Sequence, residues 1–301
     1  MLTRSGSAGI VDAADLPDEW RRRLTQPRPL LARLGQRAPL PLVMGILNIT
    51  PDSFSSDGHG GDADAAIAAA HAMHAAGAGI IDIGAESTRP GAAEVTTAEE
   101  LARLAPLWAK LEPGVQVSID TRKSAVMAAA LDGGAIIVND VSALTHDPAA
   151  AALVAQRGCP VVLMHHQGTP ATMQQAPAYK DVLLDVYDWL EHRIAAAVAA
   201  GIDRDRIIAD PGIGFGKSAA HNQALLKGLG LLHGLGVPIL LGASRKSLIS
   251  HICGPVPVAD RLPGSLAMAL AGANAGVQFL RVHDVAETVQ ALRLWAAGHP
   301  G

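Results

Sequence analysis

The chain is 301 residues long and 49% of it is apolar, so it can bury a large core as one α/β domain or as two small ones. Its formal net charge is −4, and its basic residues form no run longer than Arg21–Arg23, which argues against nucleic-acid binding. The N-terminus lacks the apolar segment of a secretory signal, no stretch is apolar enough to span a membrane, and the two cysteines have no metal-ligand spacing. We therefore expect a cytoplasmic protein whose partner is a small molecule.

Residues 1–38 differ in composition from the rest of the chain. They are polar and rich in Arg, Pro and Gly, with one short amphipathic piece over residues 15–26. We predict that they form an N-terminal extension packed outside the main body, and that residues 39–301 form a single domain.

Residues 39–301 alternate short apolar runs with longer segments of helical periodicity, which is typical of a parallel sheet covered by helices. The predicted strands are Leu42–Leu47, Ile80–Gly84, Val115–Ile119, Ile136–Asn139, Val161–Met164, Ile207–Ala209, Ile239–Gly242 and Gln278–Val282. The predicted helices are Asp62–Ala76, Thr97–Leu111, Lys123–Asp132, Pro148–Gln156, Tyr179–Ala200, Ala219–Leu232, Val258–Ala273 and Asp284–Ala297. Eight strands and eight helices in alternation predict a (β/α)₈ TIM barrel, with a doubly wound open sheet as the alternative.

Polar or glycine-rich residues follow every predicted strand. In chain order they are "NITPDSFS", "AESTRPG", "DTRK", "NDVSA", "HHQGT", "DPGIGFGKS", "ASRKS" and "RVHD". Any one of them could simply cap the next helix. All eight would meet at the face of the barrel where active sites lie, so together they indicate a substrate site.

Cationic side chains after the last two strands indicate that the substrate carries an anion. Lys246, Arg281 and His283 stand where many barrels hold a phosphate, and Arg89 could reach the same charge from the second loop. Asn48 could place an oxygen ligand for a metal ion beside that anion.

Three further polar residues at strand ends suit a flat heterocycle. Asp120, Asn139 and Asp210 offer acceptors and an amide to a ring with N–H donors and a carbonyl, although Asp210 could instead be a helix cap. "GIGFGKS" is not a phosphate-binding P-loop, because Pro211 stands where that motif needs its first glycine. We interpret it as a glycine loop whose Phe215 could cover a ring.

These motifs, in this order over residues 43–285, closely resemble those of the dihydropteroate synthase family of folate biosynthesis, which sulfonamides inhibit. They are "MGILNITPDSFS", "DIGAESTRPGA", "SIDT", "NDVSA", "DPGIGFGKS", "GASRKS" and "RVHDV". The resemblance implies a transferase that joins 6-hydroxymethyl-7,8-dihydropterin diphosphate to p-aminobenzoate, giving 7,8-dihydropteroate and pyrophosphate. It also implies a TIM barrel, Mg²⁺ and a homodimer.

The resemblance further implies a role for each matching residue. The pterin would lie among Asp120, Asn139, Met164, Asp210 and Lys246, and Asp120, Lys246 and Arg281 would be catalytic. The diphosphate would meet Asn48, Arg89, Arg281 and His283, with Asn48 near the magnesium ion. The p-aminobenzoate would contact Thr88, Pro90, Phe215, Lys246 and Ser247. The loops Ile49–Gly61 and Ala85–Val95 would be mobile lids.

Two departures from the family pattern concern these loops. Ala85 replaces a glycine that the family usually has, and "SSDGHGGD" is longer than the usual "SDGG". Two rival functions stay open: a pterin-binding methyltransferase barrel, which has no reason to keep "STRP", "SRKS" and "RVHD" together, and a catalytically silent relative that binds a pterin.

Overall fold

The computed structural model describes residues 16–26, 28–35, 40–49, 61–86, 94–112, 114–168 and 177–298, with residues 61 and 62 described by their backbone only. Within these ranges, parallel strands form an 8-stranded sheet in the order β6-β5-β4-β3-β2-β1-β8-β7. The two end strands of this order, β6 and β7, meet through a parallel bridge between Ala209 and Ile239, so the sheet is a nearly closed barrel. This closure confirms the predicted (β/α)₈ fold and excludes the doubly wound open sheet.

The strands are β1 (Leu42–Asn48), β2 (Ile80–Gly84), β3 (Val117–Asp120), β4 (Ile137–Asp140), β5 (Val161–Met164), β6 (Ile207–Asp210), β7 (Leu240–Leu241) and β8 (Phe279–Val282). Several strands run one residue further than predicted, because parallel pairing continues through the polar residue at their end. Asn48 pairs with Gly84, and Gly84 pairs with Asp120. These polar side chains are therefore held by the sheet and do not belong to the loops.

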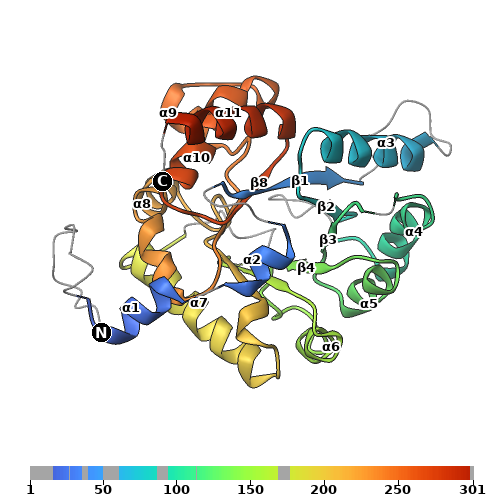
Figure 1. The fold of residues 1–301 in the computed structure, drawn as a ribbon, viewed down its shortest axis with the longest axis horizontal. Helices are drawn as coiled ribbons and strands as arrows, with labels where there is room; N and C mark the ends of the chain where they lie inside the picture. Colours follow the sequence, from blue (N-terminus) through green and yellow to red (C-terminus); the bar gives the residue numbers. More distant parts are fainter. Residues whose placement is uncertain are drawn as a thin grey trace.

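Helices surround the strands in Figure 1. The α-helices are α1 (Asp18–Thr25), α2 (Pro29–Arg33), α3 (Gly61–Ala75), α4 (Thr97–Trp108), α5 (Ser124–Asp132), α6 (Ala150–Arg157), α7 (Val182–Ala199), α8 (Ala219–Lys227), α9 (Leu248–Cys253), α10 (Leu262–Asn274) and α11 (Val285–Gly298). Short 3₁₀ segments are η2 (Arg204–Arg206), η3 (Leu229–Leu235) and η4 (Val258–Asp260). In the described part of the chain, no helix combines the length and the apolar character needed to cross a membrane.

Two predicted helices are shorter than expected for reasons visible in the sequence. The helix predicted to reach Leu232 ends at Lys227 and continues as the 3₁₀ segment η3, where Gly228 and Gly230 disfavour an α-helix. The helix predicted from Val258 begins at Leu262, because Pro263 suits the first turn of a helix and not its interior. The short helix α9 was not predicted.

The end of the barrel opposite the strand-end polar residues is closed by an apolar plug. One buried cluster joins Leu42, Met44, Ile80, Ile137, Val162, Ile208, Leu240 and Phe279 from the strands with Leu30 of α2 and Leu34, the residue directly after that helix. Leu30 and Leu34 are each only 5% exposed. The prediction that residues 1–38 pack outside the main body is therefore wrong for the segment 30–34, whose Leu30 and Leu34 are part of a buried core cluster.

Helix α1, by contrast, docks on the outer surface of the barrel, against α7 and η3. The Trp20 ring stacks on Tyr187 of α7 at a centroid distance of 5.8 Å, and Arg23 pairs with Glu191 at 2.7 Å. A methyl group on Gly234 of η3 would lie only 2.0 Å from the Trp20 ring, so this glycine leaves room for the tryptophan. The contacts join the start of the chain to α7 and η3.

Candidate active site

Strand alternation brings the polar residues together above the apolar plug. Side chains two positions apart on a strand point to the same side of a sheet, and the plug residues point inward. Two positions further on, the strands carry Asp82 after Ile80, Asn139 after Ile137, Met164 after Val162, Asp210 after Ile208 and Arg281 after Phe279. The polar residues thus converge inside the barrel at the carboxyl ends of its strands.

Arg281 of β8 is the centre of this convergence. Its Nε donates to Asp82 Oδ2 at 2.6 Å, and its Nη2 donates to Asp120 Oδ2 at 2.6 Å. Asn139 Nδ2 also donates to Asp82 Oδ2, at 2.9 Å. One guanidinium therefore orients two carboxylates from two other strands, and an amide from a third completes the network.

The charges in this network perturb each other strongly. Burial raises the pKa of Asp120 to about 7; Arg281 opposes this rise, and the carboxylates of Asp82 and Asp140 add to it. Burial alone would lower the pKa of Arg281, but Asp82 and Asp120 outweigh it, so its pKa rises and the group stays charged. The site holds a fixed cation beside a carboxyl group whose charge depends on its surroundings.

Two carboxylate oxygens in this network have no hydrogen-bond partner within the described residues. They are Asp82 Oδ1 and Asp120 Oδ1, and both are buried. Because a buried acceptor without a donor costs about 1–3 kcal/mol, such atoms are suited to a ligand that brings N–H groups.

Asp210 occupies the opposite wall of the barrel, at the end of β6. It is 5% exposed, and its Oδ1 accepts from the backbone N–H of Gly212 at 2.7 Å. Burial raises its pKa to about 6, against the opposing effects of that hydrogen bond, Lys246 and Arg281. Met164, the register neighbour of Asp210 on β5, is also buried beside it. The alternative that Asp210 is a helix cap is wrong, because Ser218 caps α8, and Asp210 accepts instead from the turn at Gly212.

Lys246 and Phe215 come together from the loops after β7 and β6. Lys246 Nζ lies 4.0 Å from the centroid of the Phe215 ring, within the range of a cation–π contact. Ser247, the next residue, is exposed and precedes α9. A half-buried aromatic ring with a cation on it offers a surface for a flat anionic molecule.

The backbone conformation of Arg245 sets the direction in which Lys246 and Ser247 leave β7. Arg245 has a left-handed φ of 56°, which a non-glycine residue rarely adopts, and four contacts hold it there. Its side chain pairs with both carboxylate oxygens of Asp284, its N–H donates to Ser265 Oγ at 2.8 Å, and its carbonyl accepts from Arg261 at 3.0 Å. Next to it, Ser244 Oγ lies 3.1 Å from His283 Nδ1, so the segments after β7 and β8 are joined twice.

Asn48 is the last residue of β1 and is half-buried at the same end of the barrel. Three predicted site residues, Thr88, Arg89 and Pro90, lie outside the described residues, as does most of both predicted lids. The structure therefore brings together Asp120, Asn139, Met164, Asp210, Phe215, Lys246, Arg281 and His283 at one end of the barrel.

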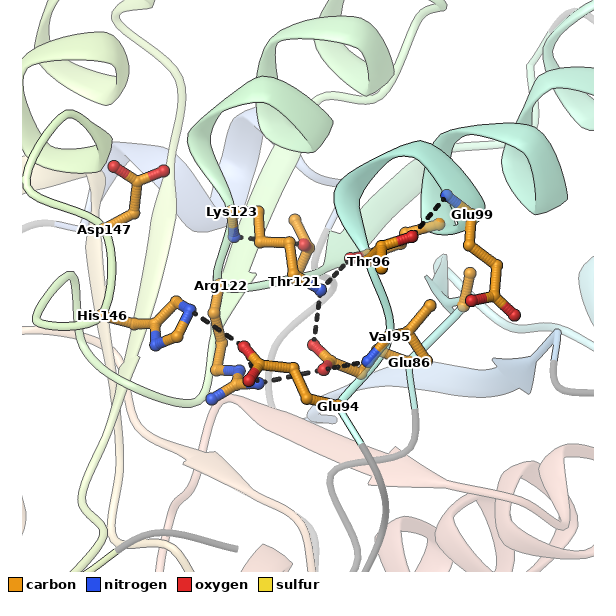
Figure 2. A network of polar contacts seen from close by, with 12 residues as sticks. Glu86, Glu94, Val95, Thr96, Glu99, Thr121, Arg122, Lys123, His146 and Asp147 are labelled. Atoms are coloured by element: carbon orange, nitrogen blue, oxygen red, sulfur yellow. Dashed lines mark hydrogen bonds and ion pairs between the residues drawn. The ribbon is translucent and has the colours of Figure 1, made fainter.

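A buried ion-pair network lies at the two ends of the second predicted lid (Figure 2). Glu86 Oε1 accepts from the backbone N–H of Val95 at 3.2 Å and from Arg122 at 3.0 Å, while its Oε2 accepts from Lys123 at 3.1 Å. Lys123 also pairs with Glu100 at 2.8 Å. Despite its burial, hydrogen bonds and the two cations keep the pKa of Glu86 below its usual value. The charged carboxylate joins residues on both sides of the loop to the segment after β3.

Sequence reasoning missed Asp82, Arg245 and the Glu86–Lys123 pair. Asp82 is a carboxylate within the apolar run "IIDIG", and that isolated charge was the signal that could have identified it. Arg245 gave no signal, because a left-handed φ at arginine cannot be read from sequence.

The fold and the polar end of the barrel define a small-molecule enzyme site, and comparisons with known proteins specify the family. Residues 44–283 match the family model described as "Pterin binding enzyme". Dihydropteroate synthase of Escherichia coli K12 is 46% identical over 256 residues, which covers 84% of this chain and 90% of that protein.

Two solved structures have the same fold over most of their length. Dihydropteroate synthase of Xanthomonas albilineans with 4-aminobenzoic acid has a TM-score of 0.82 and 46% identity, covering 87% of this chain and 94% of that one. The Yersinia pestis enzyme in a sulfonamide complex has a TM-score of 0.81 and 43% identity, covering 88% and 99%. The chain belongs to the pterin-binding enzyme family and, within it, to the dihydropteroate synthases.

Proposed function

We propose that this protein condenses 6-hydroxymethyl-7,8-dihydropterin diphosphate with p-aminobenzoate to give 7,8-dihydropteroate and pyrophosphate. The observation that carries the proposal is the Asp82–Arg281–Asp120 network at the carboxyl end of the barrel, where two buried carboxylate oxygens have no partner among the described residues. It combines acceptors for a nitrogen-rich ring with a fixed cation for an anion. This protein is therefore a transferase of a pterin methylene group.

The pterin would bind between the two acidic walls. Asp120 Oδ1 is a buried acceptor without a donor among the described residues, and Asn139 on β4 and Asp210 on β6 are buried at the same end of the barrel. A ring N–H and an exocyclic amine supply the donors that such acceptors require. Met164 would pack against the ring, and Lys246 would border it.

The diphosphate would bind to Arg281 and His283, with Asn48 and Arg89 completing its surroundings. Mg²⁺ commonly binds through one or two protein oxygens together with substrate phosphates. Asn48 fits such a role, and among the described residues no group of three or more His, Cys, Asp or Glu side chains could hold a metal alone. We therefore propose a magnesium ion carried by the substrate, which when bound would neutralise diphosphate charge.

The p-aminobenzoate would bind on the Phe215 and Lys246 pair. Its ring would pack on Phe215, its carboxylate would meet Lys246 and Ser247, and Thr88 and Pro90 would border it from the second loop. The same surface would accept a sulfonamide, which has a similar shape and charge.

The reaction needs charge stabilisation more than proton transfer. The bond between the pterin methylene carbon and the diphosphate oxygen breaks with its electron pair leaving on the diphosphate, which Arg281 and His283 stabilise. The electron-poor methylene then accepts the lone pair of the aromatic amine, and the amine proton leaves to solvent. Asp120 and the other ring-facing acceptors favour the positive charge that develops on the pterin. We assign no general base.

We further propose that the protein is a cytoplasmic homodimer. The observation in favour of association is that three large apolar residues late in the chain are exposed: Ile252 at 57%, Val258 at 52% and Leu294 at 71%. They belong to α9, η4 and α11, of which α9 and α11 are both drawn at the top of Figure 1. Analytical ultracentrifugation of the purified protein measures its oligomeric state.

Turnover with both substrates tests the proposed function. Purified protein is incubated with dihydropterin diphosphate, p-aminobenzoate and Mg²⁺, and pyrophosphate release is followed with and without the aminobenzoate. Release that requires both substrates and falls on addition of a sulfonamide is the expected result. Pterin binding without any release would instead identify a catalytically silent relative, and transfer of a methyl group would identify the rival barrel.

A further inference from the structure

The lysine of the "GIGFGKS" stretch is buried beneath the site, and neither the P-loop motif nor the proposed chemistry explains it. Lys217 is 3% exposed, and its Nζ lies 2.8 Å from His165 Nδ1, 3.0 Å from the Gly212 carbonyl and 3.0 Å from the Phe215 carbonyl. The His165 carbonyl is also near, at 3.4 Å. A single amino group therefore joins the segment after β5 to the loop after β6.

The surroundings of Lys217 Nζ are suited to an ammonium group. Carbonyl oxygens only accept hydrogen bonds, and burial together with the charge of Lys217 lowers the pKa of His165 to about 2, so its ring is neutral. The three N–H groups of an ammonium match the Nδ1 atom and the two carbonyls at 3.0 Å, whereas a neutral amine has only two. Burial, the largest effect, and the charge of Lys246 lower the pKa of Lys217 to about 7, whereas Asp210 favours the charged form.

The glycine loop that Lys217 holds is closely packed on both sides. Gly212 and Gly216 have left-handed φ values of 65° and 64°, and a methyl group on them would lie 1.9 Å from the His165 carbonyl and 2.6 Å from the Gln167 carbonyl. On the other side, a methyl group on Gly214 would lie 3.2 Å from Lys246 Cδ. The loop therefore fits between the segment after β5 and the stem of Lys246.

We infer that Lys217 is a positioning residue, which holds the glycine loop against His165 so that Phe215 lies beneath Lys246 at the p-aminobenzoate side of the site. Its Nζ binds the carbonyl of Phe215 itself, and the Phe215 ring in turn contacts Lys246 Nζ at 4.0 Å. Among the described residues, Lys217 Nζ makes no hydrogen bond to the pterin-side residues Asp120, Asn139 and Asp210, and Asp210 acts on it only through its charge. We therefore expect the main effect of Lys217 at the p-aminobenzoate side. This inference rests on the proposed function.

The test compares Lys217→Met, which keeps the length of the side chain and removes its N–H groups, with the wild type and with Lys227→Met. Lys227 is an exposed lysine of α8 and serves as the matched control. We expect the KM for p-aminobenzoate to rise about tenfold or more in Lys217→Met, with the KM for dihydropterin diphosphate changed less than about threefold. A merely structural role would lower the active fraction and leave both KM values unchanged.

A double-mutant cycle with Phe215→Leu tests whether Lys217 acts through Phe215. In the Phe215→Leu background, Lys217→Met is expected to raise the aminobenzoate KM less than about twofold further, because the two residues act as a unit. Fully additive effects, an unchanged aminobenzoate KM, or equal rises in both KM values would overturn the inference. If Lys217→Met does not fold, Lys217→Gln, which keeps two N–H donors, is compared in the same way with a smaller rise expected.

The two proposals fail in different ways. Absence of dihydropteroate formation by the wild type contradicts the proposed function, whereas wild-type turnover with unchanged variant KM values contradicts only the role of Lys217. A crystal structure of Lys217→Met gives a readout independent of activity, since the inference requires the Phe215 ring to leave its position 4.0 Å from Lys246 Nζ.

Discussion

Arg281 Nε on β8 binds Asp82 Oδ2 on β2 at 2.6 Å across the intervening strand β1, although the two residues are 199 positions apart in the chain. Asp82 thereby fixes the guanidinium that is proposed to bind the diphosphate. We expect Asp82→Asn to lower kcat/KM about 10- to 100-fold, since a hydrogen bond to a charged group contributes about 1.5–3 kcal/mol. Steady-state kinetics measures the effect. Glu191→Gln, which breaks an ion pair outside the barrel, is the control, and equal kcat/KM in the two variants would contradict the role of Asp82.

Asp120→Asn should lower turnover and also change how the stability of the folded protein depends on pH. Between an unfolded pKa of about 3.8 and a folded pKa of about 7, the folded protein holds a proton on Asp120 that the unfolded chain has released. Rising pH across this window therefore destabilises wild type, and the asparagine variant lacks this effect. We expect the Tm of the variant relative to wild type to increase from about pH 4 to about pH 8, while turnover falls strongly.

Calorimetry across the pH range and a turnover assay measure these two outcomes. A Tm difference that does not change with pH would contradict the raised pKa of Asp120. Turnover near the wild-type value would remove Asp120 from the mechanism.

Arg245→Gly should be more stable than Arg245→Ala. Both changes remove the ion pair with Asp284, but only glycine adopts a φ of 56° without a steric cost, which is about 1 kcal/mol for alanine. Urea unfolding of the two variants measures the difference. If Arg245→Ala is instead more stable than Arg245→Gly, residue 245 does not keep its left-handed conformation in the variants.

Lys123→Met should be strongly destabilising, because it leaves Glu86 and Glu100 buried without their shared cation. Loss of one partner of a buried ion pair costs about 3–5 kcal/mol. Lys110→Met removes an exposed pair with Asp64 and should cost less than about 1 kcal/mol. Denaturant unfolding measures both changes, and similar costs for the two variants would contradict the importance of the buried network.

Leu30→Ala should destabilise the barrel and leave its chemistry intact. Leu30 is 5% exposed in the plug at the end opposite the site, so truncation should cost about 2–4 kcal/mol. Leu31→Ala, on the same helix and only partly buried, is the control. Thermal unfolding and turnover at low temperature measure the two effects, and a cost no larger than that of the control would show that α2 does not close the core.

The sequence predicted the barrel because its apolar runs and helical segments alternate regularly from Leu42 onward, and parallel strands then bring their polar carboxyl ends together. Asp120, Asn139 and Asp210 were found by this rule. Asp82 was missed because its strand is buried on both faces, so the apolar run gives no sign of which side points inward. The role of α2 was missed because a five-residue helix is too short to show periodicity.

The position of Lys217 illustrates a further limit of sequence reasoning. Its motif resembles a phosphate loop, but the Lys217 side chain turns inward and donates to the backbone carbonyls of Gly212 and Phe215 in the same loop. Only the packing of Gly212 and Gly216 on residues 165–167 reveals that direction.

Strands β6 and β7 are joined by the single bridge between Ala209 and Ile239, so few backbone hydrogen bonds hold this junction, and we expect the barrel to open there first. Asp210 and Lys246 lie on opposite sides of this junction. A ligand that contacts both residues therefore holds β6 and β7 together. Amide hydrogen exchange at Leu240–Leu241 that is slower with the ligand than without it would show that the ligand contacts Asp210 and Lys246 at the same time.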